Sequence, residues 1–447
     1  MSKRFLEESV LFVSILKWSL LAALVGIVVG CSTAIFLKLL DLSISVTATF
    51  KYYFLFLPLA LFLSTLLVQY LAPEAKGHGT EKVIEAIHKR FGKIKPVVVP
   101  VKLVATIITL AMGGSAGKEG PCAQIGAGLS SIIASILKFG NKDRRKLVIC
   151  GISSGFAAVF GTPIAGAMFG LEVLFVGGVL YDVLLPSFIA GIVSYQVTTY
   201  LGISYFHEPL RFVPVFSGFF FIKVCLSGLF FGFCSFLFIE VLRYFEQISR
   251  RIRIWQPFKG LIGGAALVLL SLVFSAKYLG LGLETIKTSL EGNFIERGAF
   301  LLKMLFTSIT LGFGGSGGIV TPIFFIGAAS GNFFANILGL DPAIFSAIGL
   351  VSLLAGAANT PIAASILAIE LFGASVAPYS AVSCVISFLM TGHRSVYPSQ
   401  ILAVSKSPSI KVQRFKELDE SENISIRPRP KSIVGFLVKM MEKIRKK

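Results

Sequence analysis

The sequence is short of charge. Only 15% of its 447 residues are Asp, Glu, Lys or Arg, whereas 55% are hydrophobic and the mean hydropathy is +0.82. Soluble globular domains carry about 25% charged residues, so a water-soluble fold of this size is excluded. Uncharged stretches cover residues 52–73, 183–206, 304–340 and 371–393, and several exceed the roughly 20 residues that span the hydrocarbon core of a bilayer. The composition therefore predicts a protein that crosses a membrane several times.

Residue patterns of catalysis and of metal binding are also missing. No His, Cys, Asp and Glu residues have metal-ligand spacing, and no Ser or Cys nucleophile has an evident base. The run GGSAGK at 113–118 is one residue too short for a phosphate-binding loop, and Glu119 stands where Ser or Thr would hold magnesium. The six cysteines lack paired spacing and are expected to be small core residues. We therefore expect that the protein is not an enzyme and that it has no cofactor, no metal site and no catalytic residue.

The net charge of +19 does not indicate nucleic-acid binding. The basic residues lie in short connections and near the C-terminus rather than on a basic domain. Under the positive-inside rule, the connections 89–102, 138–146 and 243–259 are candidates for the cytoplasmic face. Residues 1–405 are the predicted transmembrane domain. Residues 406–447 are predicted to be a basic cytoplasmic tail, either solvated or bound to anionic lipid, with no regulatory domain.

Two segments of the first half of the chain recur in the second half. TLAMGGSAGKEGP at 109–121 aligns without gaps to TLGFGGSGGIVTP at 310–322, an offset of 201 residues (310 − 109). GFAAVFGTPIAGAMFGLEV at 155–173 aligns to LLAGAANTPIAASILAIEL at 353–371 in the same order. The second pair shares TPIA and a glutamate at an offset of 198 residues (370 − 172), namely Glu172 and Glu370. Such repeats indicate a transporter whose substrate site lies near the midplane, where the repeats meet.

The repeats divide the transmembrane part into related halves at about 10–205 and 215–405. Each half contains a glycine-rich interruption followed by proline and a new apolar run, which predicts a broken helix. Helices that begin at Gly120 and Pro322 would aim unpaired N–H groups and positive dipole ends at a shared point, where an anion binds. Glycine leaves those amides open to an ion. The alternative is that the glycines only permit close helix packing.

A charged pair, Lys118 and Glu119, interrupts this uncharged region. An intramembrane carboxylate is costly unless it is paired or solvated, so Glu119 is a functional candidate. At a helix N-terminus its carboxylate would compete with an anion, and protonation would release it, which predicts a gate linked to pH. The alternatives are an ion pair with Lys118 or a helix cap.

Four motifs in order resemble the CLC family of chloride channels and antiporters, over residues from about 10 to 402. GKEGP at 117–121 resembles the family's GREGP, and GGIVTP at 317–322 resembles its GxFxP. GHGTE at 77–81 lies where the family has GSGIP, and GHRSVYPSQ at 392–400 places Tyr397 near the end of the last membrane helix. The resemblance implies an all-α bundle of roughly 16 to 18 helices, in two inverted-repeat halves with broken helices.

The resemblance also implies a homodimer in which each subunit has its own pore. In this chain the external gating glutamate would be Glu119. The backbone of Ile319 and Val320 and the hydroxyl of Tyr397 would coordinate the anion. Together with the helix starts, the expected anion-binding residues are His78, Gly117, Gly120, Ile319, Val320, Thr321 and Tyr397.

Some positions depart from the family pattern. His78 replaces the central serine; it can donate to an anion and gain charge near neutral pH, or be a capping or interface residue. Val320 replaces the phenylalanine of GxFxP, and the following Thr321 either contacts an ion or proton or simply starts a helix. Val173 lies where chloride/proton antiporters keep a second, internal glutamate; passive channels and fluoride/proton antiporters of the family also lack it. Glu172 and Glu370 are expected at helix ends or at the subunit interface.

The sequence therefore predicts transport of chloride or a related halide, with Glu119 gating an anion/proton antiport. A passive voltage- or pH-gated chloride channel and a fluoride/proton antiporter remain open as alternatives. The expected partners are chloride or fluoride ions, protons, membrane lipid and a second copy of the chain. The expected location is a prokaryotic plasma membrane.

Overall fold

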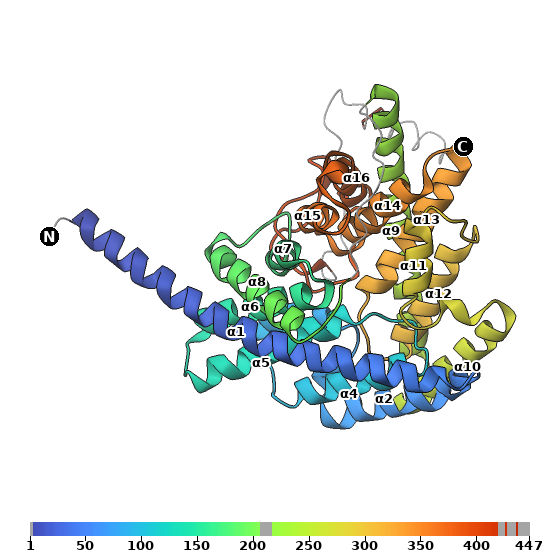
Figure 1. The fold of residues 1–447 in the computed structure, drawn as a ribbon, viewed down its shortest axis with the longest axis horizontal. Helices are drawn as coiled ribbons and strands as arrows, with labels where there is room; N and C mark the ends of the chain where they lie inside the picture. The colour runs from blue at the N-terminus through green and yellow to red at the C-terminus, as the bar shows by residue number, and fades with distance from the viewer. Residues whose placement is uncertain (1–2, 206–216, 419–424, 427–434, 437–447) are drawn as a thin grey trace.

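The computed structural model describes residues 3–205, 217–418, 425–426 and 435–436. Sixteen α-helices make up nearly all regular structure in this part of the chain, within the range predicted from the sequence (Figure 1). Six helical segments are long and apolar enough to cross a membrane by length and composition. The all-α membrane fold expected from the sequence is confirmed.

The helices fall into two sets of eight. The first set is α1 Lys3–Ala48, α2 Leu57–Leu71, α3 Thr80–Arg90, α4 Val98–Ala111, α5 Glu119–Ile136, α6 Asn141–Phe160, α7 Pro163–Glu172 and α8 Leu184–Tyr200. The second set is α9 Gly218–Arg251, α10 Gln256–Val273, α11 Leu283–Leu290, α12 Ala299–Gly312, α13 Val320–Leu338, α14 Pro342–Ala358, α15 Pro361–Phe372 and α16 Ala377–Met390. Helices α4 and α12 start 201 residues apart (299 − 98), as do α6 and α14 (342 − 141). The repeat in the sequence is therefore a repeat of helices.

Short elements connect these helices. The 3-10 helices are η1 Tyr53–Phe56, η2 Pro73–Ala75, η3 Tyr181–Val183, η4 Ala276–Tyr278 and η5 Ala374–Val376. The strands are β1 Phe175–Val176, parallel to β2 Ile401–Leu402, and β3 Ile410–Lys411, antiparallel to β4 Ser425–Ile426. The β1–β2 pair ties the chain after α16 to the chain after α7.

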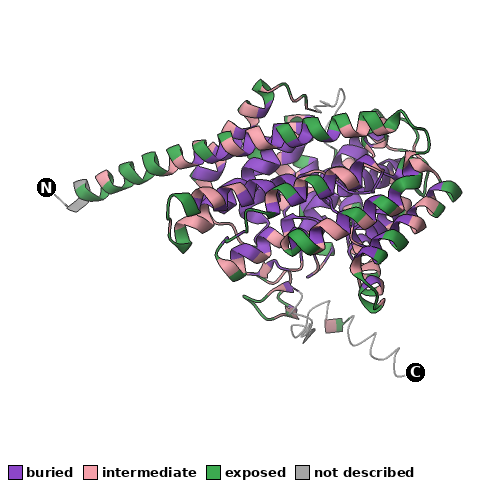
Figure 2. Ribbon diagram, turned by 90° about the horizontal axis from the view of Figure 1, so that it is seen from below, coloured by how far each residue is buried: buried purple, intermediate pink, exposed green. Residues whose placement is uncertain are grey.

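Buried residues fill the middle of the bundle (Figure 2), where small residues at the helix contacts allow close packing. A Cβ on Gly126 of α5 would overlap the carbonyl oxygen of Gly151 on α6, and one on Gly327 of α13 would overlap that of Gly349 on α14. Such close backbone approach is how membrane helices associate. The outer faces carry exposed apolar side chains, for example Leu20 at 64% and Leu269 at 65% exposure, which suits contact with lipid.

Both predicted interruptions are present, and each is held by the other half. The N–H of Ser115 donates to the Thr310 hydroxyl and that of Ser316 donates to the Thr109 hydroxyl, both at 3.1 Å. Gly113 and Gly314 occupy equivalent places with φ of +94° and +105°, a conformation that favours glycine. The two halves thus interlock at their non-helical backbone, which is buried in protein as the membrane interior requires.

The predicted helix starts need correction. Helix α5 begins at Glu119 rather than Gly120, and α13 begins at Val320 rather than Pro322. Proline is the third residue of each helix, not the first. A proline is tolerated there because the first N–H groups of a helix have no intrahelical partner to lose.

Candidate ion-binding site

The two helix starts lie side by side. Gly117 donates its N–H to the carbonyl of Gly318 at 2.7 Å, and Gly318 donates back to Gly117. This pair joins the loop before α5 to the loop before α13. A Cβ on Gly120 would lie 3.1 Å from the Cα of Gly318. The amino ends of α5 and α13, one from each half, therefore meet, as the repeat predicted.

Glu119 lies in this junction and is 1% exposed. Its carboxylate accepts hydrogen bonds from the N–H of Thr321, at 3.1 Å, and from the Thr321 hydroxyl. Glu119 therefore occupies the N-terminus of α13, in the other half of the molecule. No ion pair joins Lys118 to Glu119 among the described residues, so that alternative is wrong. Glu119 does cap a helix, but that helix is α13 rather than α5, the helix to which Glu119 belongs.

Four of the other predicted residues surround this junction. Val320 is the first residue of α13, Ile319 precedes it, and both are fully buried. A Cβ on Gly120 would overlap the carbonyl oxygen of His78, which places the start of α3 against the start of α5. The Gly117 Cα lies beside the Glu119 carboxylate and Thr321. The amides of Gly120 and Val320 belong to helix starts, whose first N–H groups have no intrahelical acceptor. The Gly117 N–H, in contrast, is already donated to the Gly318 carbonyl.

His78 and Tyr397 add two unpaired polar atoms. The His78 Nδ1 and the Tyr397 hydroxyl are buried and form no hydrogen bond of good geometry within the described residues. The two rings lie with centroids 5.8 Å apart, and Thr80 is a polar neighbour of the hydroxyl. The His78 carbonyl lies against Gly120 and the His78 ring lies beside the Tyr397 ring, so the hydroxyl belongs to the same region. Buried donors without partners are costly, which indicates a place for an acceptor such as an anion.

A cavity of about 470 Å³ leads to this region. Gly77, His78 and Val396 form part of its wall, so it ends beside the predicted site. Its charged lining residues are Lys76, Lys82, Arg243, Arg250 and Lys259 against Glu81 and Glu246. Five cations and two carboxylates give a positive potential, which raises the local concentration of anions.

Two lysines that the sequence did not single out are buried at equivalent places in the two halves, and one of them lies beside the site. Lys102, assigned there to a basic connection, lies in α4 and is fully buried, as is Lys303 in α12. Lys102 donates to the carbonyls of Ala75 and Gly77 at 3.1 and 2.6 Å. Lys303 donates to the carbonyls of Tyr278 and Gly280 at 3.0 and 2.8 Å. The sequence signal is a third repeat, GHGTE at 77–81 and GLGLE at 280–284, with lysines 201 residues apart (303 − 102).

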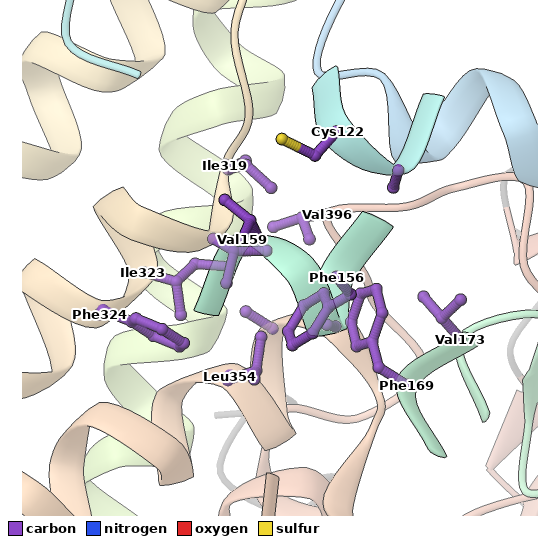
Figure 3. Packing of buried hydrophobic residues seen from close by; sticks show 14 of the residues in the cluster. Cys122, Phe156, Val159, Phe169, Val173, Ile319, Ile323, Phe324, Leu354 and Val396 are labelled. Atoms are coloured by element: carbon purple, nitrogen blue, oxygen red, sulfur yellow. The ribbon is translucent and has the colours of Figure 1, made fainter. Parts of the chain in front are cut away.

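Val173 lies in the apolar core and is fully buried. Figure 3 shows it in a cluster to which both halves contribute. The labelled members are Cys122, Phe156, Val159, Phe169 and Val173 from the first half and Ile319, Ile323, Phe324, Leu354 and Val396 from the second. The position of a second internal glutamate is thus filled by hydrocarbon, and no proton can be bound there.

Hydrogen bonds from buried polar side chains hold the segment that carries Tyr397. Gln400 donates to the carbonyls of Val173 and Ala358, both at 2.8 Å, and Asn359 donates to the Gln400 side chain at 3.0 Å. Lys406 reaches Asn359 Oδ1 at 2.6 Å, and burial lowers the pKa of Lys406. The residues after β2 therefore fasten the Tyr397 segment to the end of α14.

His393, at the other end of this segment, is neutral. Burial first, then the charges of Lys406 and Arg394, lower the pKa of His393 to about 4. Its Nε2 accepts the N–H of Lys406 at 3.1 Å, which requires the unprotonated nitrogen. His393 is a structural acceptor here, outside the ion site.

Comparison with known proteins gives a consistent result. Residues 59–392 match the family described as voltage gated chloride channel. The chain is 36% identical over 408 residues to the chloride/fluoride channel protein of Pseudomonas syringae pv. tomato, covering 90% of each. It is 28% identical over 337 residues to an H+/Cl− exchange transporter of Vibrio cholerae, covering 69% of each.

Solved structures share the fold. The crystal structure of a CLC-type fluoride/proton antiporter matches with a TM-score of 0.82 at 30% identity, covering 86% of this chain and 98% of the other. A slow cyanobacterial Cl−/H+ antiporter matches with a TM-score of 0.73 at 22% identity, covering 84% and 94%. The second likeness concerns the fold alone.

Proposed function

Because the chain belongs to the voltage gated chloride channel (CLC) family, we propose that it exchanges a halide ion for protons across a membrane. Glu119 is the gate of this exchange. The observation that carries the proposal is the position of the Glu119 carboxylate, which takes both the N–H and the hydroxyl of Thr321 at the start of α13.

A carboxylate bound to a helix N-terminus occupies the place of an anion. While Glu119 is ionised, it competes with a halide for the Thr321 donors and for the positive end of α13. Protonation removes the charge, weakens both hydrogen bonds and frees the donors. A halide then binds where the carboxylate was, so occupancy by halide and protonation of Glu119 are coupled.

The remaining predicted residues complete the halide site in this proposal. The N–H groups at the starts of α5 and α13, near Gly120 and Val320, supply backbone donors. The hydroxyl of Tyr397 and the ring of His78 supply the two buried polar atoms that lack partners. The positive cavity beside His78 supplies halide from the face that we assign to the cytoplasm, because the basic connection 243–259 lines it.

Fluoride is the favoured halide, with chloride as the alternative. The relative at 36% identity is named a chloride/fluoride channel protein, and the structure at 30% identity is a fluoride/proton antiporter. Thr321 adds a hydroxyl donor next to the backbone donor. Fluoride is a small ion and a strong hydrogen-bond acceptor, which suits a site built from closely spaced N–H and O–H donors.

We also place the protein in a prokaryotic plasma membrane as a homodimer. Helices α7 and α15 have only 10 and 12 residues, too short to span a bilayer, and they pack against each other. They expose Ile164, Ile362 and Ile369 at 43%, 47% and 41%. A second copy covering this face would shield the ends of both short helices from lipid.

Reconstitution in liposomes tests the proposal. A halide gradient is imposed, and halide movement is followed with an ion-selective electrode while proton movement is followed with a pH electrode. Wild type is expected to drive protons uphill against their own gradient. Glu119→Gln, which cannot bind and release a proton, is expected to move halide without protons. Halide movement by wild type with no proton signal at any gradient would contradict antiport and support a passive channel.

A further inference from the structure

Glu81 is a second carboxylate next to the ion site. It lies in the first turn of α3, three residues after His78, and forms part of the cavity wall. Its Oε1 accepts the N–H of Ser399 at 3.0 Å and the Ser399 hydroxyl. Its Oε2 is buried and has no hydrogen-bond partner among the described residues.

Glu81 and Glu119 lie on different elements in the region of the Tyr397 hydroxyl. Glu119 precedes Gly120, which lies against the His78 carbonyl, and the His78 and Tyr397 ring centroids are 5.8 Å apart. Ser399, which holds Glu81, is only two residues beyond Tyr397, so Glu81 is fixed to the segment that carries this hydroxyl. The Tyr397 hydroxyl forms no hydrogen bond of good geometry within the described residues. Glu81 is in the cavity wall and Tyr397 and Glu119 are not, so Glu81 is the member of this group that the cavity reaches.

The charged groups around Glu81 do not neutralise it. No salt bridge to Glu81 is formed in the described part of the chain, and the neighbouring Lys82 pairs with Glu85 at 2.6 Å. The titratable groups that face it are His78, Lys82 and Glu85 from α3 and its preceding loop, Tyr397 from the segment after α16, and Lys76, Arg243, Glu246, Arg250 and Lys259 across the cavity. A carboxylate exposed to a cavity on one side and enclosed on the other can exchange protons with water and pass them inward.

We propose that Glu81 is the cavity-side proton-binding residue of the exchange. Val173 cannot serve in this role because its side chain has no titratable group. A proton from water in the cavity binds the Glu81 carboxylate, which forms part of the cavity wall. Glu81 then donates it to the Tyr397 oxygen while Tyr397 gives its own proton to the Glu119 carboxylate. One proton moves from Glu81 to Glu119, and Tyr397 is neutral before and after. The inference rests on the proposed antiport and names the inner part of its proton path.

The repeat supplies a matched control. Glu284 is the residue that corresponds to Glu81 in GLGLE, at the start of α11, and it is exposed. It lies outside the cavity wall and the ion site. Glu284→Gln therefore repeats the chemical change of Glu81→Gln in the same local sequence without touching the path.

The experiment measures the ratio of protons to halide moved in liposomes by wild type, Glu81→Gln and Glu284→Gln. Glutamine keeps an oxygen that accepts from Ser399, so the segment is held, but it cannot carry a proton. We expect the ratio to fall at least 10-fold in Glu81→Gln while halide movement continues, and to stay at the wild-type value in Glu284→Gln. A wild-type ratio in Glu81→Gln, or an equal loss of both fluxes, overturns the proposal.

Ser399→Ala separates a proton path from a purely structural bond. The Ser399 hydroxyl stabilises the ionised form of Glu81, so its loss favours the protonated form. We expect Ser399→Ala to keep coupling and to shift the midpoint of the pH dependence of proton transport to higher pH. An unshifted midpoint contradicts the role of Glu81. If wild type moves halide without protons, the antiport itself fails, which is distinguishable from a failure confined to Glu81.

Discussion

Glu172 and Glu370 cap each other's helices. The Glu172 carboxylate, at the end of α7, accepts the N–H groups of Ile362 and Ala363 at 3.1 and 2.8 Å. The Glu370 carboxylate, near the end of α15, accepts those of Ile164 and Ala165 at 3.0 and 2.8 Å. Each acid thus stabilises the start of the other short helix, which meets the expectation that they serve helix ends.

Removing either cap should lower stability without changing the ion site. A carboxylate at a helix N-terminus contributes about 0.5–2 kcal/mol. We expect Glu172→Ala and Glu370→Ala to lower the thermal unfolding temperature in detergent by similar amounts, because their partners are equivalent. The proton-to-halide ratio of the folded fraction should stay at the wild-type value. A changed ratio would place one of these acids in the ion path instead.

The Thr321 hydroxyl should matter for halide binding itself. Binding is best measured by calorimetry in Glu119→Gln, where no ionised carboxylate competes for the site. A hydrogen bond to a charged group contributes about 1.5–3 kcal/mol, so adding Thr321→Val should weaken halide binding about 10-fold or more. Thr321→Ser, which restores a hydroxyl, should recover most of it. Equal affinities for the Val and Ser variants would remove Thr321 from the site.

Gly120 should tolerate no side chain. An added Cβ would overlap the His78 carbonyl oxygen, and the nearby Gly318 leaves α5 no room to retreat. We expect Gly120→Ala to lose halide binding or to fail to fold. The matched change Gly140→Ala, at the start of α6 where nothing lies within 4 Å of the new Cβ, should leave binding and unfolding temperature unchanged. Normal binding by Gly120→Ala would contradict the close contact between α3 and α5.

The two buried lysines should differ in function although they are alike in structure. Replacing either with methionine leaves two carbonyls without their charged donor, which costs roughly 1–3 kcal/mol. Lys102 also places a positive charge near His78. Lys102→Met should therefore weaken halide binding, whereas Lys303→Met should mainly lower the unfolding temperature. Equal effects of both changes on halide affinity would show that the charge of Lys102 does not act on the ion.

The sequence predicted the centre of the molecule because the repeat marks it. Glycine and proline at equal offsets indicate broken helices whatever the surrounding residues are, and the junction of Gly117 with Gly318 follows from that symmetry. Glu119 was a candidate because an ionised carboxylate inside a membrane has a high free-energy cost unless it is paired or solvated. The exact helix starts were not predictable, since proline fits any of the first positions of a helix.

Contacts between distant segments leave no local signal in the sequence. Nothing local shows that the Glu119 carboxylate reaches Thr321 rather than Lys118. Lys102 resembles a loop residue in sequence because its charge follows a basic connection, and only the fold buries it against the Ala75 and Gly77 carbonyls. Glu81 looks like an ordinary first-turn acid, and its enclosure depends on Ser399, which is 318 residues away in the chain.

In the proposed exchange, helices from both halves point at one halide site for which Glu119 competes. Bromide scatters X-rays anomalously, so crystals of Glu119→Gln grown in bromide locate this site. We expect an anomalous peak between the starts of α5 and α13, within hydrogen-bond distance of the Thr321 N–H, and a weaker peak in wild type at high pH. Bromide density in both proteins only elsewhere, or none at this junction, would contradict it.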